Sequence, residues 1–98
     1  MAAPTLNASM HFMVVDDDYE SCGTIAEYLR AAGYSKVTLA YDGLEALHKL
    51  DQDPSINFVI SDWVMPHLNG LQLLQGVKLD PARAHITFLV ISNPSETG

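Results

Sequence analysis

The stretch that decides the fold spans residues 57–66, which read Asn57-Phe58-Val59-Ile60-Ser61-Asp62-Trp63-Val64-Met65-Pro66. Its first half is apolar, rich in β-branched and aromatic residues, and ends on an aspartate; Asn69-Gly70 follow soon after as a turn signal. A short apolar run bounded by turn residues predicts a strand buried on both faces, the kind found in parallel sheets. Ligands of open α/β sheets bind outside the carboxyl ends of the strands. We therefore expect Asp62 to lie where such a fold carries out its chemistry.

The remaining chain alternates between apolar runs and segments with a helical period. Strands are predicted over residues 10–15, 36–40, 56–61 and 86–91. Helices are predicted from Tyr19 to before Gly33, from the capping Asp42 to before Pro54, and from Gly70 to Leu79. The apolar positions expected to form the buried stripes of these helices are Cys22, Ile25, Ala26 and Leu29 in the first, Leu44, Leu47 and Leu50 in the second, and Leu71, Leu74 and Val77 in the third.

This βαβαβαβ order predicts an α/β fold, because right-handed crossovers produce a parallel, doubly wound sheet with helices on both faces. We expect the strand order 2-1-3-4, which places the first and third strands side by side at the switch point. Asp16 and Asp17 follow the first strand and Asp62 follows the third. The three carboxylates should therefore converge in one cleft.

Converging carboxylates favour a bound cation or a shared proton. Two of them about 4 Å apart repel by roughly 4 kcal/mol at an effective dielectric constant near 20. An all-oxygen ligand set of this kind suits Mg²⁺, and the backbone carbonyl of Val64 could add a further oxygen. Once a metal neutralises the cluster, one carboxylate can act as a nucleophile toward a phosphoryl group. The hydroxyl of Ser92, at the end of the fourth strand, could then donate a hydrogen bond to that group.

The bulk composition is that of one folded domain. The chain has 98 residues, 48% of them hydrophobic and 17% charged, and a net charge of −7, which argues against direct nucleic-acid binding through a basic surface. Residues 1–9 read as a loose tail and not as a signal peptide, and no apolar run is long enough for membrane insertion. The single Cys22 fits a reducing, cytoplasmic location and is expected to be a small core residue. The four histidines, which lack metal-ligand spacing, are expected at the surface or in loops.

Four segments together resemble the receiver domain of two-component response regulators, especially the single-domain chemotaxis regulators. They are Val14-Val15-Asp16-Asp17, Phe58-Val59-Ile60-Ser61-Asp62-Trp63-Val64-Met65-Pro66, Asn69-Gly70-Leu71 and Leu89-Val90-Ile91-Ser92. The resemblance covers about residues 12–92 and implies a flavodoxin-like fold over residues 10–98, as a signalling domain and not an enzyme, although family members assist their own phosphorylation and dephosphorylation.

The resemblance also implies a role for each matching residue. Asp62 would accept phosphate from the phosphohistidine of a histidine kinase or phosphotransfer protein. Asp16 and Asp17 would hold Mg²⁺, with Asp62 and the Val64 carbonyl as further ligands. Ser92 would be the switch hydroxyl, and phosphorylation would change the affinity for a downstream protein target.

The sequence departs from the family after the fourth strand. The family's fifth strand, with the lysine that pairs with the phosphoryl group, and its fifth helix are missing from these 98 residues, and Asn93-Pro94 replace the usual small residue after Ser92. Residues 86–91 read as a central strand but would then lie at an edge of the sheet. Because exposed apolar edges invite pairing with another chain, we expect a homodimer or segment exchange through this edge.

Two other functions fit parts of the pattern. One is a pseudo-receiver, which binds a partner through its surface without being phosphorylated. The other is an aspartyl-phosphate hydrolase resembling the haloacid dehalogenases, with Asp16 as nucleophile and Asp18 as acid. That family has Thr or Val where this chain has Glu20, and for Asp18 alone a helix-capping or exposed role is the simpler interpretation.

Overall fold

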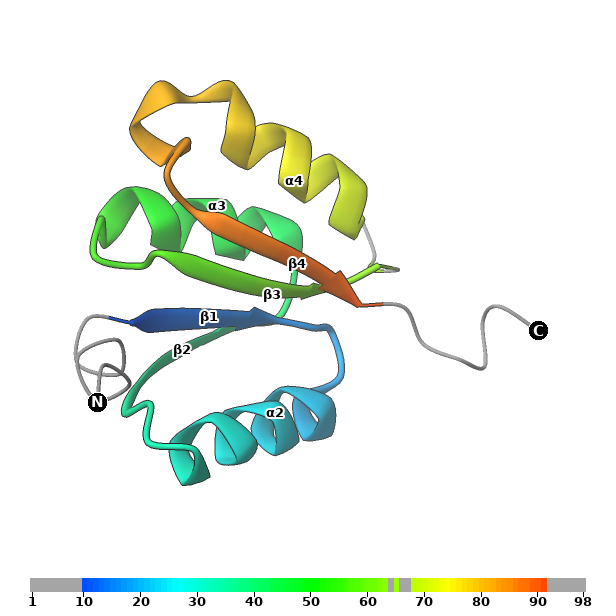
Figure 1. Ribbon diagram of the computed structural model, residues 1–98. Helices are drawn as coiled ribbons and strands as arrows, with labels where there is room; N and C mark the ends of the chain where they lie inside the picture. Colours follow the sequence, from blue (N-terminus) through cyan, green and yellow to red (C-terminus); the bar gives the residue numbers. More distant parts are fainter. Residues whose placement is uncertain (1–9, 64, 66–67, 92–98) are drawn as a thin grey trace.

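The computed structural model describes residues 10–63, 65 and 68–91. In chain order its elements are β1 (His11–Val15), α2 (Tyr19–Ala31), β2 (Lys36–Ala40), α3 (Gly43–Gln52), β3 (Phe58–Asp62), α4 (Gly70–Leu79), the 3-10 turn η1 (Pro81–Arg83) and β4 (Thr87–Ile91). All paired strands run parallel and lie in the order β2-β1-β3-β4 (Figure 1). The predicted fold class and strand order are therefore confirmed.

The helices cover the two faces of the sheet unequally. On one face α3 and α4 pack against each other and over the strands, and on the other α2 packs against β1 and β2 (Figure 1). The main core lies under α3 and α4, where Met13, Val15 and Val59 from the strands meet Leu73 and Val77 of α4. The alternate residues of β1 point to the face that α2 covers, because successive strand side chains alternate between faces.

Each long helix begins at a side-chain cap near the carboxyl end of a strand. Asp18 caps α2, Asp42 caps α3 by accepting from the Glu45 amide at 2.7 Å, and Asn69 forms a reciprocal capping box with Gln72 at the start of α4. These caps satisfy backbone N–H groups that the first helical turn leaves without partners. All three helices begin after the carboxyl end of a strand, on the side of the sheet where Asp16, Asp17 and Asp62 lie.

The expected inner stripes of α3 and α4 were partly wrong. Leu44 is 60% exposed and Leu71 is 42% exposed. The fully inward positions are instead Gly43, Ala46 and Leu50 in α3, and Gly70, Leu73 and Val77 in α4. In both helices the buried stripe begins at the first residue, a glycine, because that residue lies too close to a neighbouring loop to carry a side chain. Of the predicted positions, Leu50 and Val77 are confirmed as buried and Leu47 packs against the core, so the error lies at the first position of each stripe.

His11 also departs from the expectation of a surface or loop histidine. It opens β1, and only 12% of its side chain is exposed. Its Nδ1 lies 2.8 Å from the Ser55 hydroxyl and its Nε2 lies 2.8 Å from the Thr38 hydroxyl. The ring therefore links β1 to β2 and to the loop before β3. His48 and His85 are exposed, as expected.

Within the described part of the chain, none of the helices has the length and apolar character needed to cross a membrane.

The corrected register of α4 makes a direct prediction about stability. Replacing Leu73, which is fully buried, by alanine should lower the free energy of unfolding by about 2 to 5 kcal/mol, because it leaves a cavity in the core. The matched change Leu71→Ala removes the same atoms from a half-exposed position and should cost less than about 1 kcal/mol. Urea unfolding of both variants measures the difference. Equal costs at the two positions would contradict the observed register.

Candidate functional site

Three carboxylates meet at the carboxyl ends of the two central strands. Asp16 and Asp17 directly follow β1, and Asp62 is the last residue of β3. One carboxylate oxygen from each residue lies within 4.8 Å of those of the other two. The cause is the parallel pairing of β1 with β3. It sets Val15 beside Ser61 and brings the carboxyl ends of the two strands together. The structure thus brings together the three acids that the sequence singled out.

Asp16 is the most buried member of this acid cluster, with 8% of its surface exposed. Its Oδ1 accepts a hydrogen bond from the Asp18 amide at 3.0 Å, which favours the ionised form. Burial outweighs that bond, and together with the charge of Asp62 it raises the pKa of the Asp16 carboxyl to about 6. Asp17 is exposed and adds to the same effect. Near neutral pH, keeping negative charge in this partly buried cluster therefore costs free energy. A bound cation would offset that cost.

Asp62 is more accessible than Asp16, and a fixed turn holds it. The Trp63 amide donates to Asp62 Oδ1 at 2.8 Å and to the Ile91 carbonyl at 2.9 Å. The Gly70 amide in turn donates to the Trp63 carbonyl at 2.8 Å. A Cβ atom on Gly70 would lie 2.5 Å from the Asp62 carbonyl oxygen, so α4 can approach this closely only with glycine at its first position. The backbone that carries Asp62 is thereby tied to the start of α4.

Two of the expected site residues, Val64 and Ser92, lie outside the described residues. Asp18 is exposed; its Oδ1 accepts from the Glu20 amide at 3.2 Å and its Oδ2 from the Ser21 hydroxyl at 2.9 Å, so its capping role is confirmed. Trp63 is 44% exposed beside the cluster.

Cys22 is fully buried below the acid cluster, with its Sγ 3.3 Å from the Asp16 carbonyl oxygen. Burial, reinforced by the Asp16 charge, raises the pKa of the thiol to about 11. The expected role of Cys22 as a core residue is confirmed.

The sequence reasoning missed an aromatic pair beside the acid cluster. The rings of Tyr19 and Tyr41 lie with centroids 4.3 Å apart, and Tyr19 is 71% exposed. Tyr19 opens α2 and Tyr41 follows β2, two segments that the sheet order makes neighbours. No spacing in the sequence signals this contact, because it depends on β1 and β2 lying side by side.

The acid cluster fits a hard divalent cation. Its three candidate ligands are all carboxylates at the carboxyl ends of β1 and β3, and burial, with the nearby charge of Asp62 as a smaller contribution, raises the pKa of Asp16. Oxygen donors of this type are the ligands that Mg²⁺ prefers, usually with several waters retained. Asp16, Asp17 and Asp62 are the described residues that would hold the ion.

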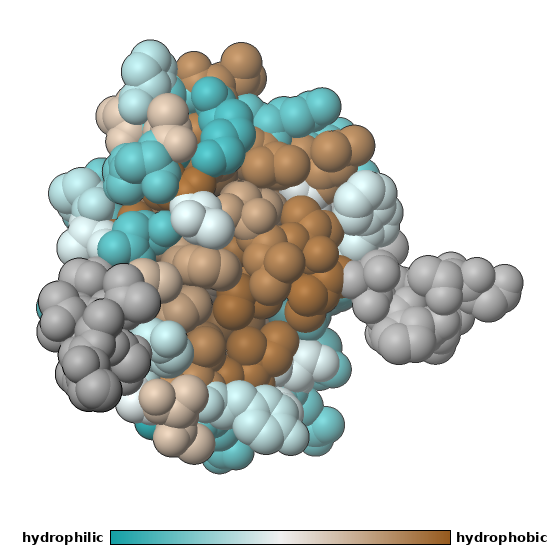
Figure 2. Space-filling model, in the orientation of Figure 1, coloured by the Kyte–Doolittle hydropathy of each residue, from teal (hydrophilic) through white to brown (hydrophobic). Residues whose placement is uncertain are grey.

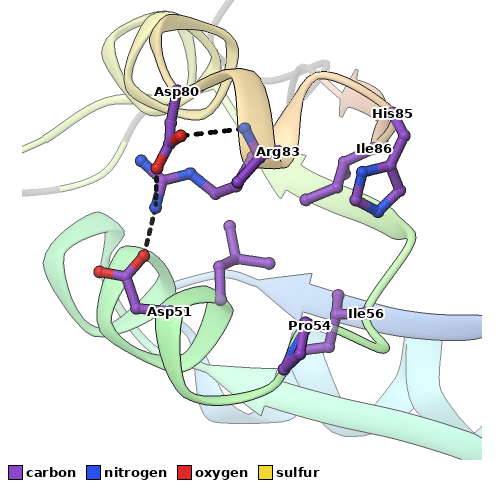
Figure 3. A pocket seen from close by; sticks show the side chains of 9 residues that line it. Asp51, Pro54, Ile56, Asp80, Arg83, His85 and Ile86 are labelled. Atoms are coloured by element: carbon purple, nitrogen blue, oxygen red, sulfur yellow. Dashed lines mark hydrogen bonds and ion pairs between the residues drawn. The ribbon is translucent and has the colours of Figure 1, made fainter.

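A second hollow lies at the opposite end of the sheet, before β3 and β4 (Figure 3). It is a cavity of about 120 Å³ with Leu50, Pro54, Ile56 and Ile86 among its lining residues. The Arg83 guanidinium beside it is paired with Asp51, lies 3.8 Å from Asp80, and donates to the Gly76 carbonyl at 3.1 Å. Because these partners already engage the Arg83 guanidinium, this cavity is a weaker candidate for a binding site than the acid cluster.

Comparison with known proteins agrees with this geometry. The family of response regulator receiver domains matches residues 12–97. The chemotaxis protein CheY-3 of Vibrio cholerae is 33% identical over 87 residues, covering 89% of this chain and 66% of that protein. CheY1 of Helicobacter pylori is 36% identical over 83 residues, covering 85% of this chain and 67% of that protein. The chain thus spans about two thirds of the length of these relatives.

A solved structure gives the same result. The NMR structure of BeF3-activated CheY2 with Mg²⁺ from Sinorhizobium meliloti aligns with a TM-score of 0.71 at 32% identity, covering 86% of this chain and 64% of that one. The chain therefore belongs to the response regulator receiver domain family, and it resembles the chemotaxis-type members.

The close approach of α4 to Asp62 predicts opposite effects for one substitution at two glycines. Gly70→Ala should lower the free energy of unfolding by about 1 to 3 kcal/mol, because the added Cβ collides with the Asp62 carbonyl oxygen. Gly23→Ala, in the interior of α2 with no atom within 4 Å of the added Cβ, should instead raise it by about 0.5 to 1 kcal/mol. Thermal or urea unfolding compares the two. A neutral Gly70→Ala variant would show that the turn is not fixed as described.

The raised pKa of Asp16 predicts a pH-dependent effect of Asp16→Asn in metal-free buffer. The folded protein retains the Asp16 proton up to about pH 6, whereas the unfolded chain loses it near 3.8, so stability falls as pH rises between these values. The asparagine variant avoids this loss. Since one pKa unit corresponds to about 1.4 kcal/mol and solvent screens part of it, we expect the variant to be more stable by about 1 to 2 kcal/mol at pH 8.

The advantage of Asp16→Asn should disappear below about pH 4, where the parent carboxyl is protonated in both states. Asp18→Asn, which changes an exposed cap nearby, is the control and should show no such gain. Melting temperatures measured with a chelator across this pH range test the expectation. An Asp16→Asn variant no more stable than the parent at pH 8 would contradict it.

Proposed function

We propose that the chain is a phosphoacceptor in two-component signalling, with Asp62 taking a phosphoryl group from the phosphohistidine of a histidine kinase or phosphotransfer protein. The observation that carries the proposal is the convergence of Asp16, Asp17 and Asp62 at one sheet edge, in a chain of the receiver family. In this reaction an Asp62 carboxylate oxygen bonds to phosphorus while the phosphorus–nitrogen bond breaks, and its electron pair stays on the imidazole.

The structure favours Asp62 over Asp16 as the acceptor. Asp62 is only partly buried, so a phosphoryl donor can approach it, whereas Asp16 is buried. The hydrolase alternative also needs Asp18 as an acid. Asp18 instead caps α2 through its Oδ1, while its Oδ2 accepts from the Ser21 hydroxyl.

Mg²⁺ held by Asp16, Asp17 and Asp62, with the Val64 carbonyl as the proposed further ligand, would neutralise the carboxylates and the charge that develops during transfer. Support comes from the three carboxylates of the site, and from the BeF3-activated CheY2 relative, which was solved with Mg²⁺. Ser92 is proposed as the hydroxyl that binds the transferred group. We place this activity in the cytoplasm, where the single Cys22 would remain reduced.

A phosphoryl group on Asp62 would act on partners through charge and through α4. It adds roughly 1.5 to 2 negative charges and strong acceptor oxygens at the sheet edge. The Trp63–Gly70 hydrogen bond connects the acceptor turn to the first residue of α4. A shift of that turn would therefore move the N-terminus of α4, which we propose changes the affinity for a downstream protein.

The test is intact-protein mass spectrometry after incubation with Mg²⁺ and a small acyl-phosphate donor. We expect one phosphoryl adduct on the parent, no adduct on Asp62→Asn, and an adduct on the control Asp18→Asn, which changes an exposed acid two residues from Asp16. Replacing Mg²⁺ by a chelator should abolish the adduct.

Other outcomes identify the competing functions. An adduct that survives Asp62→Asn but not Asp16→Asn would indicate the hydrolase type of chemistry. A parent protein that never gains the adduct, although Mg²⁺ changes the fluorescence of Trp63, would indicate a pseudo-receiver and would overturn the proposal.

A further inference from the structure

We propose that Ser61 is a positioning residue for phosphoryl transfer to Asp62. Its hydroxyl fixes the peptide unit that joins Asp62 to Trp63, and the amide of that unit in turn holds the Asp62 carboxylate. This role rests on the proposed function of Asp62 as the phosphoryl acceptor. It is argued from the burial of Ser61 and from the hydrogen bonds at the end of β3.

Ser61 is a polar residue in apolar surroundings. Its side chain is fully buried, and its partners in the neighbouring strands are Val15 and Val90. Val59, two residues earlier and on the same face of β3, belongs to the main core. Figure 2 shows further hydrophobic residues gathered over β3 and β4 in the orientation of Figure 1. Because a buried hydroxyl costs free energy unless it is hydrogen-bonded, packing alone would favour an apolar side chain here.

The buried polar or charged residues of the described chain lie together at the acid site. They are Asp16 and Ser61. Asp16 is a member of the acid cluster, and Ser61 directly precedes Asp62, another member. The position of Ser61 therefore points to a role at the site and not in the core.

The Ser61 hydroxyl acts on the acceptor through one peptide unit. Its Oγ donates to the Asp62 carbonyl oxygen at 3.0 Å. A trans peptide unit is planar, and its C=O and N–H groups point in opposite directions, so a bond to this carbonyl also sets the direction of the Trp63 N–H. That N–H donates to Asp62 Oδ1 at 2.8 Å and to the Ile91 carbonyl at 2.9 Å. The unit is thus held on both sides.

The start of α4 leaves this peptide unit little room to tilt. A Cβ atom on Gly70 would lie 2.5 Å from the same Asp62 carbonyl oxygen, and the Gly70 amide donates to the Trp63 carbonyl at 2.8 Å. With Oδ1 held by the Trp63 amide, rotation of the Asp62 carboxylate is restricted. Holding a reacting group in one orientation accelerates a transfer step, and it does so without any contact between Ser61 and the donor.

The rate of phosphoryl adduct formation tests this role, followed by intact-protein mass with saturating Mg²⁺ and a small acyl-phosphate donor. Ser61→Ala removes the hydroxyl and leaves a small apolar residue in an apolar place. We expect the adduct to form about two- to tenfold more slowly, the range that corresponds to one neutral hydrogen bond. The affinity for Mg²⁺, followed by Trp63 fluorescence, should stay close to that of the parent because all three carboxylates remain.

Two further variants separate the hydroxyl from a general effect on stability. Ser61→Thr keeps the hydroxyl and should recover most of the rate. Ser55→Ala removes a hydroxyl from the loop before β3, at the opposite end of that strand, and is the control that should react like the parent. Thermal unfolding establishes that each variant is folded. Among folded variants, Ser61→Ala reacting at the parent rate would overturn the proposal, as would Ser61→Thr reacting as slowly as Ser61→Ala.

Amide hydrogen exchange measures the positioning without any phosphoryl group. In Ser61→Ala the Trp63 amide should exchange faster than in the parent, while the Leu73 amide, bonded to the Asn69 carbonyl in α4, should be unchanged. Unchanged exchange at Trp63 in a chain that does gain the adduct would overturn the role of Ser61 alone. A parent that gains no adduct would overturn the proposed function and, with it, any role of Ser61 in transfer.

Discussion

The parallel pairing of β1 with β3 is the constraint on which the rest of the structure depends. It buries Met13, Val15 and Val59 in one core. At the carboxyl ends of the same two strands it brings Asp16 and Asp62 close together. The apolar burial that stabilises the sheet thus also holds like charges at close range. Burial first, and the charge of Asp62 second, raise the pKa of Asp16, and a cation bound at these strand ends would offset both effects.

The second constraint is the close approach of α3 and α4 to the loop that follows the carboxyl end of β3. Gly43 lies against Leu68, and Gly70 lies against the Asp62 backbone, so in both helices the first residue is a glycine that a larger residue could not replace without moving a loop. The inner stripes of both helices start from these glycines. Fold and site are therefore coupled: the packing that completes the core also fixes the turn that presents Asp62.

The two outer strands of the described sheet, β2 and β4, differ in charge and in their contacts. The β2 edge carries lysine and is tied to α3, while the β4 edge is uncharged and lies beside an apolar face. The acid cluster lies at the ends of the strands, and the β4 edge runs along the side of the sheet.

The sequence by itself determined the order of elements, the strand order 2-1-3-4 and the meeting of Asp16, Asp17 and Asp62, because apolar runs, caps and crossover handedness are local or general rules. Only the tertiary structure decided where the buried stripes of α3 and α4 begin, why Leu44 and Leu71 are exposed, and why His11 is enclosed by two hydroxyls. Those outcomes depend on how closely distant segments approach one another. The helical period of apolar residues indicates the buried face, but the contact surfaces of the neighbouring segments determine where the buried stripe begins.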